Sequence, residues 1–302
     1  MKETFETRDP SFARIVPADA AIEQIATGFR FTEGPLWNGD HLLFSDIPNS
    51  RIVRWQALPE GPELRTFRFP SNLANGLTFD RGGRLLACEG AARRLTRTEP
   101  DGAVAVLAER YEGKRLNSPN DVVVASTGAV YFSDPFWAHI FANPAGPSVR
   151  PEERELPFAG VFRLAPDGAL GAVADDFEVP NGLAFSPDER VLYVDDSRRG
   201  HIRAFDVRSD GSLAGGRVFA ELDGPEEGAP DGMKVDREGN VYCTGPGGVW
   251  VVAPDGTVLG RIRPPEVPAN VAWGDPEGRT LYMTARTSVY RVRLAIPGVP
   301  VR

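Results

Sequence analysis

The chain has 302 residues, of which 41% are hydrophobic and 25% charged, a composition that is ordinary for a folded globular protein. Its net charge of −8 and the lack of a dense Lys/Arg cluster disfavour binding to a phosphate backbone, so nucleic acid is not an expected partner. No apolar run approaches the roughly 20 residues that a membrane helix needs, and no membrane partner is expected either.

The N-terminal segment and the cysteines indicate a cell compartment. Residues 1–16 interleave charged side chains with few apolar ones and lack the hydrophobic stretch of a secretion signal, so a cytoplasmic protein is expected. Cys88 and Cys243 are too few for a disulfide framework, and they form no Cys-x-x-Cys metal site. Both thiols are expected to be reduced and buried.

A repeat begins near residue 40 and continues to the end of the chain. Six apolar segments share one strand-like pattern, with first residues 43, 45, 62, 49 and 40 positions apart. The segments are HLLFSDI from His41, RLLACEG from Arg84, AVYFSDP from Ala129, VLYVDDS from Val191, NVYCTGP from Asn240 and TLYMTAR from Thr280. Each has a further strand pattern before it and another after it. Units of about 40–50 residues with several short strands are typical of propeller blades, so the sequence predicts an all-β, six-bladed β-propeller.

We expect a single propeller domain over residues 1–302, with the last blade completed by the start of the chain. The sixth unit runs out of residues after Arg293, whereas residues 20–30 form a strand that belongs to no unit. This strand is predicted to close the ring in the sixth blade, which removes exposed sheet edges. Residues 1–19 are then an N-terminal extension. The 62-residue spacing indicates an insertion at 136–157 at the channel mouth, either a lid or a solvated loop.

The first strand of each blade lines the channel of a propeller, so the residue at its start should face the channel mouth. Counting back 8 to 10 residues from the six segments reaches only carboxylates and carboxamides. These ring residues are Glu33, Asn75, Asn120, Asn181, Asp231 and Asn270. Asn and Asp also cap strands and turns, which is the alternative interpretation. Pro230-Asp231-Gly232 resembles the hairpin tripeptide Pro254-Asp255-Gly256, but it precedes an inner strand, which favours the channel position.

Oxygen donors without sulfur or imidazole suit a hard divalent cation. Ca²⁺ is the first choice, and Mg²⁺, Mn²⁺ or Zn²⁺ could replace it. A bound cation can polarise a carbonyl oxygen while a carboxylate, Asp231 or Glu33, acts as general base toward water. The sequence has no Gly-x-Ser-x-Gly elbow, and its three histidines, His41, His139 and His201, lie outside the ring positions.

Residues at the ends of the second strands are expected to wall the same mouth. They are Asp46, Glu89, Asp134 and Asp196, together with Phe136 and Trp137 of the insertion. The candidate substrate contacts are the ring residues Asn75, Asn120 and Asn270 and the wall residues Glu89, Trp137 and Asp196. A carboxylate at a strand end is often a turn former, which is the alternative role for Asp196.

Four motifs resemble those of the gluconolactonase and regucalcin (senescence marker protein) family of propellers. The motifs are FTEGPLW around Glu33, NSPNDVVV around Asn120, PNGLAFSPD followed by LYVDDS, and APDGMKVD around Asp231. The resemblance implies that Glu33, Asn181 and Asp231 are the metal ligands and that Asp231 activates water. It also implies that Asn120 binds substrate or reaches the metal through water.

Two positions depart from the family pattern. The family has an Arg two residues before Asn120, where this chain has Ser118, and bacterial relatives often have a His where this chain has Gly90. Lys114 or Arg115 of the same loop could replace the Arg in substrate recognition.

These observations favour a metal-dependent lactonase that acts on aldonolactones such as glucono-1,5-lactone. A Ca²⁺-dependent phosphotriester hydrolase is one alternative, because a channel cation can polarise P=O as well as C=O. A non-catalytic calcium- or ligand-binding propeller is the other, because fold does not fix function.

Overall fold

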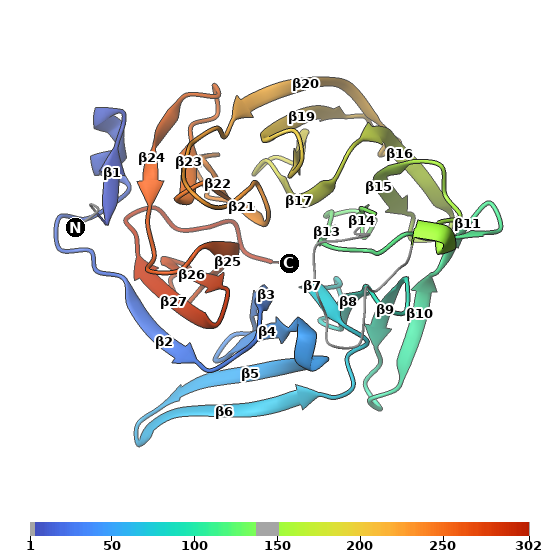
Figure 1. Cartoon of the computed structure of the whole chain (residues 1–302), viewed down its shortest axis with the longest axis horizontal. Helices are drawn as coiled ribbons and strands as arrows, with labels where there is room; N and C mark the ends of the chain where they lie inside the picture. The colour runs from blue at the N-terminus through green and yellow to red at the C-terminus, as the bar shows by residue number, and fades with distance from the viewer. Residues whose placement is uncertain (1–3, 137–150, 302) are drawn as a thin grey trace.

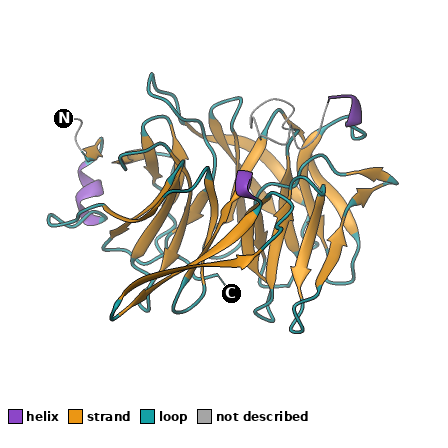
Figure 2. Ribbon diagram, turned by 60° about the horizontal axis from the view of Figure 1, so that its bottom comes forward, coloured by secondary structure: helices purple, strands orange, loops and turns teal. Residues whose placement is uncertain are grey.

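The computed structural model describes residues 4–136 and 151–301, whose blades surround a central channel (Figure 1). Six sheets of four or five antiparallel strands form the ring, so the prediction of an all-β, six-bladed propeller is confirmed. In the side view, the strands run between two faces covered by loops (Figure 2). Trp137 and His139 lie outside the described residues.

The first three blades follow one another along the chain. Blade one contains β3 (Thr32–Trp37), β4 (Leu42–Asp46), β5 (Arg51–Leu58) and β6 (Gly61–Arg68). Blade two contains β7 (Ala74–Phe79), β8 (Leu85–Glu89), β9 (Arg94–Thr98) and β10 (Val104–Ala108). A hairpin of β11 (Arg110–Tyr111) and β12 (Lys114–Arg115) comes next. Blade three contains β13 (Val122–Val124), β14 (Val130–Asp134), β15 (Ala159–Leu164) and β16 (Leu170–Phe177).

The last three blades include the two N-terminal strands. Blade four contains β17 (Pro180–Phe185), β18 (Val191–Asp196), β19 (His201–Val207) and β20 (Leu213–Glu221). Blade five contains β21 (Met233–Val235), β22 (Val241–Gly245), β23 (Gly248–Val252), β24 (Val258–Ile262) and β1 (Phe5–Thr7). Blade six contains β25 (Pro268–Gly274), β26 (Thr280–Ala285), β27 (Ser288–Arg293) and β2 (Glu23–Thr27). The described residues also form three short 3₁₀ helices, η1 (Pro10–Arg14), η2 (Ile47–Asn49) and η3 (Pro151–Glu153).

The ring closes where β2 pairs with β27. Glu23 lies opposite Arg291 and Thr27 opposite Ser288 in an antiparallel ladder. The predicted closure of blade six by an N-terminal strand is therefore confirmed. Joining the two ends of the chain in one blade ties the first and last units of the ring together.

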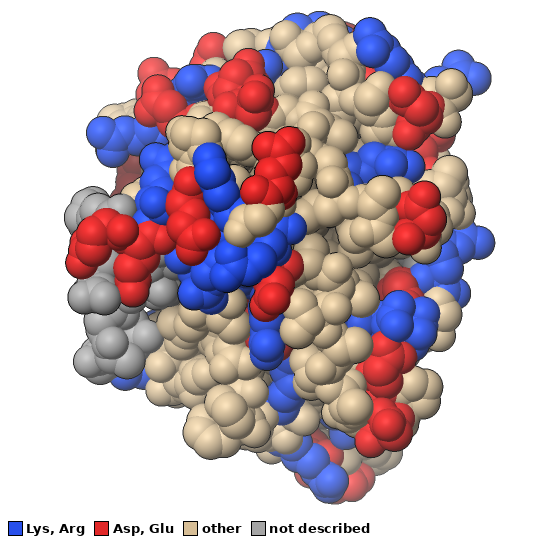
Figure 3. Space-filling view, turned by 90° about the vertical axis from the view of Figure 1, so that its right-hand side faces the viewer, with Lys and Arg blue, Asp and Glu red and all other residues tan. Residues whose placement is uncertain are grey.

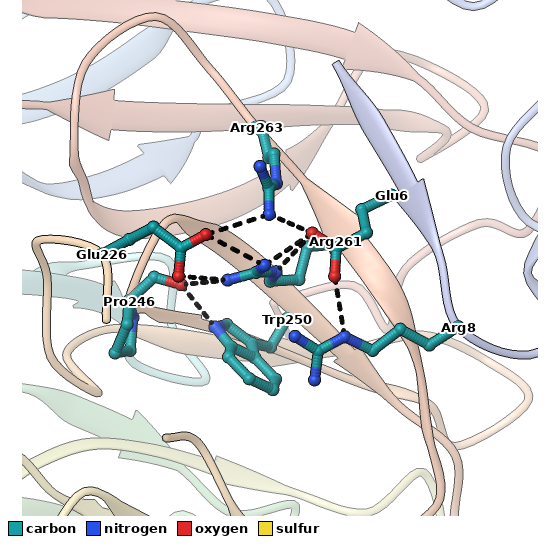
Figure 4. Close-up of polar contacts among 7 residues, drawn as sticks. All are labelled: Glu6, Arg8, Glu226, Pro246, Trp250, Arg261 and Arg263. Carbon is teal, nitrogen blue, oxygen red and sulfur yellow. Dashed lines mark hydrogen bonds and ion pairs between the residues drawn. The ribbon is translucent and has the colours of Figure 1, made fainter. Parts of the chain in front are cut away.

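The N-terminal extension also adds a strand that the sequence analysis did not expect. β1 pairs antiparallel with β24, so blade five has five strands. Glu6 of β1 faces Arg261 of β24, and both contact a cluster that includes Arg8, Glu226 and Arg263 (Figure 4). These charged contacts hold a strand that is too short to show a periodic pattern.

The apolar core lies between neighbouring blades. The second strand of blades one, two, three, five and six is buried along its whole length, because each sheet is covered by a blade on either side. Cys88 on β8 and Cys243 on β22 belong to this core as free, fully buried thiols, as expected.

The outer surface of the ring mixes both signs of charge. On the face shown in Figure 3, Lys and Arg side chains lie next to Asp and Glu side chains. Within the described residues, no helix has the length and apolar character required to cross a membrane.

Candidate functional site

Four ring residues from different blades meet through hydrogen bonds at the channel. The Asn75 amide donates to Asn120 Oδ1 at 2.6 Å, and the Asn270 amide donates to Glu33 Oε2 at 2.9 Å. Glu33 and Asn270 are separated by 237 positions in sequence. The structure therefore brings together residues that only the repeat alignment relates.

Asn181 and Asp231 join the same cluster from blade four and from the loop before β21. The Asn181 amide donates to Ser197 Oγ at 3.0 Å, and Ser197 Oγ donates to the Pro230 carbonyl at 2.6 Å, next to Asp231. Burial and Glu33 raise the pKa of the Asp231 carboxyl and Asn181 lowers it, so the side chains of Glu33 and Asn181 both lie beside Asp231. Asn181 and Asp231 also line a cavity of about 540 Å³ at the channel mouth, to which Asp231 is partly exposed.

The residues that follow the ring positions allow this close approach. A Cβ on Gly34 would lie 2.0 Å from the Asn75 carbonyl oxygen, and a Cβ on Gly232 would lie 1.8 Å from Asn270 Cγ. Real side chains do not tolerate such distances. The Glu-Gly and Asp-Gly pairs therefore let adjacent inner strands pack with their polar residues side by side.

The cluster concentrates like charge. Burial and the neighbouring Asp121 raise the pKa of Glu33, and burial and Glu33 raise the pKa of Asp231 well above its ordinary value. When both carboxylates are ionised they repel each other, which favours the protonated form of one of them. A divalent cation would relieve it, and Asn181 supplies a neutral oxygen beside them.

The donor set fits a hard cation because it consists of oxygens alone. Glu33, Asn181 and Asp231 offer two carboxylates and one carboxamide. Within residues 4–136 and 151–301, no group of three or more His, Cys, Asp or Glu side chains is arranged for metal binding. The set proposed here is of a different kind, since one of its three members is an amide.

Two buried carboxylates next to the ring were not predicted from the sequence. Asp121 follows Asn120 directly and lies 3.5 Å from the Asn270 amide. Asp195 is fully buried, its Oδ1 has no hydrogen-bond partner in the described structure, and burial and Asp231 raise its pKa. The available signal was that Asp195 occupies a position that is Ser, Cys or Thr in the other five aligned segments.

Glu89 was expected to contact substrate, but its oxygens are occupied. Oε1 accepts from Arg68 and Thr96, and Oε2 accepts from Asn72 and Arg94. The side chain is 1% exposed. These contacts make Glu89 a residue that holds the start of blade two, so we leave it out of the proposed substrate contacts.

Asp196 was also expected at the substrate, with turn formation as the alternative role. Its oxygens accept the backbone N–H groups of Glu178, Val179, Arg198 and Arg199, and it is fully buried. Asp46 accepts the Arg30 backbone N–H and the Asn49 side-chain amide, and Asp134 accepts the backbone N–H groups of Asn117 and Ser118. The wall carboxylates thus fix the loops around the mouth.

The other residues that the sequence analysis singled out are not part of the ring. Trp137 lies outside the described residues, and the Arg115 guanidinium donates to the Ala92 carbonyl. Gly90 and Ser118, the two departures from the family pattern, are neighbours, because a Cβ on Gly90 would lie 3.0 Å from Ser118 Oγ. His41 pairs with Asp40 and His201 approaches Glu221, both away from the ring.

Fold and site together define a β-propeller with a polar ring at one end of its channel. Residues 31–287 match the family model described as SMP-30/Gluconolactonase/LRE-like region, and the chain belongs to this family. The resemblance inferred from the sequence motifs is therefore confirmed.

Two curated proteins and one solved structure illustrate the similarity. The gluconolactonase of Zymomonas mobilis is 34% identical over 94% of this chain and 84% of that protein. Pentonolactonase XacC of Haloferax volcanii is 30% identical over 86% of this chain and 83% of that protein. The structure of a gluconolactonase from Xanthomonas campestris is 35% identical and superimposes with a TM-score of 0.85, covering 97% of this chain and 95% of that one.

Proposed function

We propose that this chain is a lactonase that opens sugar lactones by hydrolysis and needs one divalent cation, with Ca²⁺ as the first choice. The observation that carries the proposal is the meeting of Glu33, Asn181 and Asp231 beside a cavity of about 540 Å³. Family membership and the similarity to a gluconolactonase and a pentonolactonase support the substrate class.

Glu33, Asn181 and Asp231 are the proposed ligands. When bound, the cation polarises the carbonyl of the lactone and stabilises the negative charge that develops on its oxygen. Glu33 is closed off and accepts hydrogen bonds from the Gly34 backbone and from Asn270, whereas Asp231 is partly exposed to the cavity. Asp231 is therefore the proposed general base.

Asp231 is proposed to act as general base in the hydrolysis of the lactone ester. Its carboxylate accepts a proton from water as the water oxygen bonds to the carbonyl carbon. The bond between that carbon and the ring oxygen then breaks. The proton passes from Asp231 to the departing ring oxygen, and the product is an open-chain hydroxy acid.

The amides of the ring divide into two roles. Asn75 Oδ1 is a buried acceptor without a partner in the described structure, so a sugar hydroxyl could donate to it, and Asn120 lies beside it. Asn270 donates to Glu33 and Asp121 and accepts from the Val271 backbone, which uses its hydrogen-bonding groups within the protein. We therefore propose that Asn75 and Asn120 bind substrate and that Asn270 positions Glu33.

Hydrolysis of glucono-1,5-lactone, followed by pH-stat titration above the spontaneous rate, tests the proposal. We expect activity that EDTA abolishes and that Ca²⁺ restores. Asp231→Asn should lower kcat by about 10²- to 10⁴-fold, the usual contribution of a general base. Asp255→Asn is the matched control, because Asp255 lies in a Pro-Asp-Gly turn at the outer end of the same blade.

Two results would reject the proposal. One is full turnover after the metal has been stripped. The other is an unimpaired Asp231→Asn variant. A fluorophosphate ester in the same assay separates the phosphotriester alternative, and metal binding without turnover of either ester class identifies the non-catalytic alternative.

A further inference from the structure

The charged side chains that line the 540 Å³ cavity are paired with one exception. They are Arg198, Glu227, Asp231 and Arg286. Glu227 and Arg286 form an ion pair, and Asp231 belongs to the cluster with Glu33 and Asn181. The Arg198 guanidinium has no ion pair and no hydrogen bond with another residue in 4–136 or 151–301.

The backbone of Arg198 is fixed close to the proposed reaction centre. Its N–H donates to the buried Asp196 at 3.1 Å. The preceding residue, Ser197, contacts both the Asn181 amide and the Pro230 carbonyl. Arg198 therefore directly follows Ser197, whose hydroxyl contacts the proposed metal ligand Asn181.

Arg198 also lies where two cavities meet. A second cavity of about 700 Å³ shares Arg198 and Val179 with the first one and extends toward Phe136 and Arg154. Two acids line this outer cavity, Asp175 and Glu178, and Glu178 pairs with Arg199. A ligand with its lactone ring near Asp231 can thus place a distal group at Arg198 before it reaches Asp175.

The other arginines on this side of blade four and its neighbour have partners. Arg199 contacts Glu178 and Asp196, and Arg203 binds Asp176 with two nitrogens. The Arg154 guanidinium stacks on Phe136 at 4.8 Å and donates to the Leu156 carbonyl. Among these arginines of the described region, Arg198 is the one whose guanidinium is left for a ligand.

We propose that Arg198 forms a subsite for an anionic group, carboxylate or phosphate, at the end of the sugar lactone remote from the reacting carbonyl. A guanidinium binds either group through two parallel N–H bonds. The chain carries a net charge of −8, which repels an anionic substrate unless a local cation offsets it. The inference rests on the proposed lactonase function and narrows its substrate class to acidic sugar lactones.

Kinetics on three lactones test the subsite: glucono-1,5-lactone as the neutral member, 6-phosphoglucono-1,5-lactone, and glucaro-1,4-lactone with a free carboxylate. The wild type should favour at least one anionic lactone in kcat/KM by about 10- to 100-fold, the range of one charge-assisted bond. Arg198→Ala should remove most of this ratio, and Arg198→Lys should restore part of it. Which anionic lactone is preferred identifies the group as phosphate or carboxylate.

Arg190→Ala is the control, because Arg190 is 86% exposed in a turn at the other end of β18. It should leave the ratio at the wild-type value. Equal kcat/KM of the wild type for neutral and anionic lactones would overturn the subsite. So would an Arg198→Ala variant that loses the same factor on all three substrates.

A binding measurement keeps the subsite separate from the lactonase proposal. Calorimetry with the ring-opened acids gluconate, 6-phosphogluconate and glucarate, in the presence of Ca²⁺, needs no turnover. Tighter binding of an acid with a second anionic group than of gluconate, lost in Arg198→Ala, supports the subsite even if no lactone is hydrolysed. Equal affinity for the three acids, or the same affinities in Arg198→Ala, overturns it while leaving lactone hydrolysis to its own assay.

Discussion

Lys234 Nζ lies 3.9 Å from Asp121 Oδ2, so a cation from blade five faces a buried carboxylate from the start of blade three. Lys234 also donates to the Met233 carbonyl at 2.9 Å. Glu33 and Asp231 add further negative charge around Asp121. Lys234 thus offsets part of the charge that the proposed divalent cation would neutralise.

Replacing Lys234 with Met should therefore affect the metal-free protein more than the metal-bound one. Asp121 loses a buried counter-charge, at a cost of about 1–3 kcal/mol in unfolding free energy, and a bound Ca²⁺ compensates for part of it. Thermal unfolding with EDTA and with Ca²⁺ measures both states, so the stabilisation by Ca²⁺ should increase in the variant. Lys114→Met, at an exposed site on β12, is the control. An equal loss in both states would contradict this role.

Gly232→Ala tests whether the close approach of inner strands maintains the ring. The added Cβ would lie 1.8 Å from Asn270 Cγ, so backbone or amide must move, which costs about 1–3 kcal/mol as in other overpacked sites. Urea unfolding should show a lower free energy of unfolding, and calorimetric titration should show a lower Ca²⁺ affinity in the same variant. Gly171→Ala, which meets no atom within 4 Å, should change neither. Unchanged Ca²⁺ affinity in Gly232→Ala would show that metal binding does not depend on the close approach of the inner strands.

The attachment of β1 predicts a dependence on pH. Burial raises the pKa of Glu6, but hydrogen bonds from Arg8 and Arg261 and the charges of Arg261 and Arg263 outweigh it and lower the pKa to about 2 from an ordinary 4.5. Because the folded pKa is depressed, the stabilisation is present above pH 4.5 and is lost as the pH falls toward 2. Glu6→Gln should thus lower stability by about 1–2 kcal/mol at pH 7, with a smaller difference at pH 3.

Urea unfolding of both proteins between pH 3 and 7 measures this difference. Glu23→Gln on β2 is a suitable comparison, because its ion pair with Arg291 is exposed and should contribute less than about 1 kcal/mol. A Glu6→Gln effect that stays constant over this pH range would contradict the assignment.

Glu89→Gln separates holding a loop from binding substrate. Arg68 Nη2 contacts Glu89 at 3.2 Å, while Arg68 Nε and Nη1 have no partner in the described residues, so the variant leaves a buried guanidinium without its counter-charge. We expect a loss of about 3–5 kcal/mol in unfolding free energy with little change in KM. Glu99→Gln, which removes a more exposed acid of the same blade from its pairs with Arg84 and Arg97, should be far milder. A raised KM at wild-type stability would instead place Glu89 at the substrate.

The fold and the ring were predictable because both are periodic in sequence. The six aligned strands lie in equivalent places in six blades, so counting back 8 to 10 residues from them reached residues that do meet, such as Glu33 and Asn270. Closure by β2 followed from a missing strand in the last unit.

Features that depend on the direction of a single side chain were not predictable. Asp121 stands next to a ring residue and looked like the first residue of an apolar strand, and a shift of one position along a strand reverses the face. The hydrogen-bond partners of Glu89 and Asp196 come from loops that the sequence pattern does not place. β1 has three residues, too few to show an alternation, and is held by ion pairs across blade five.

A crystal structure of the protein grown with Ca²⁺ is the most direct test of the proposed metal centre. One cation is expected at the channel mouth, with oxygens of Glu33, Asn181 and Asp231 within about 2.3–2.6 Å of it. A cation bound elsewhere, or a ring in which these three side chains take no part in its coordination, would contradict the proposed metal centre.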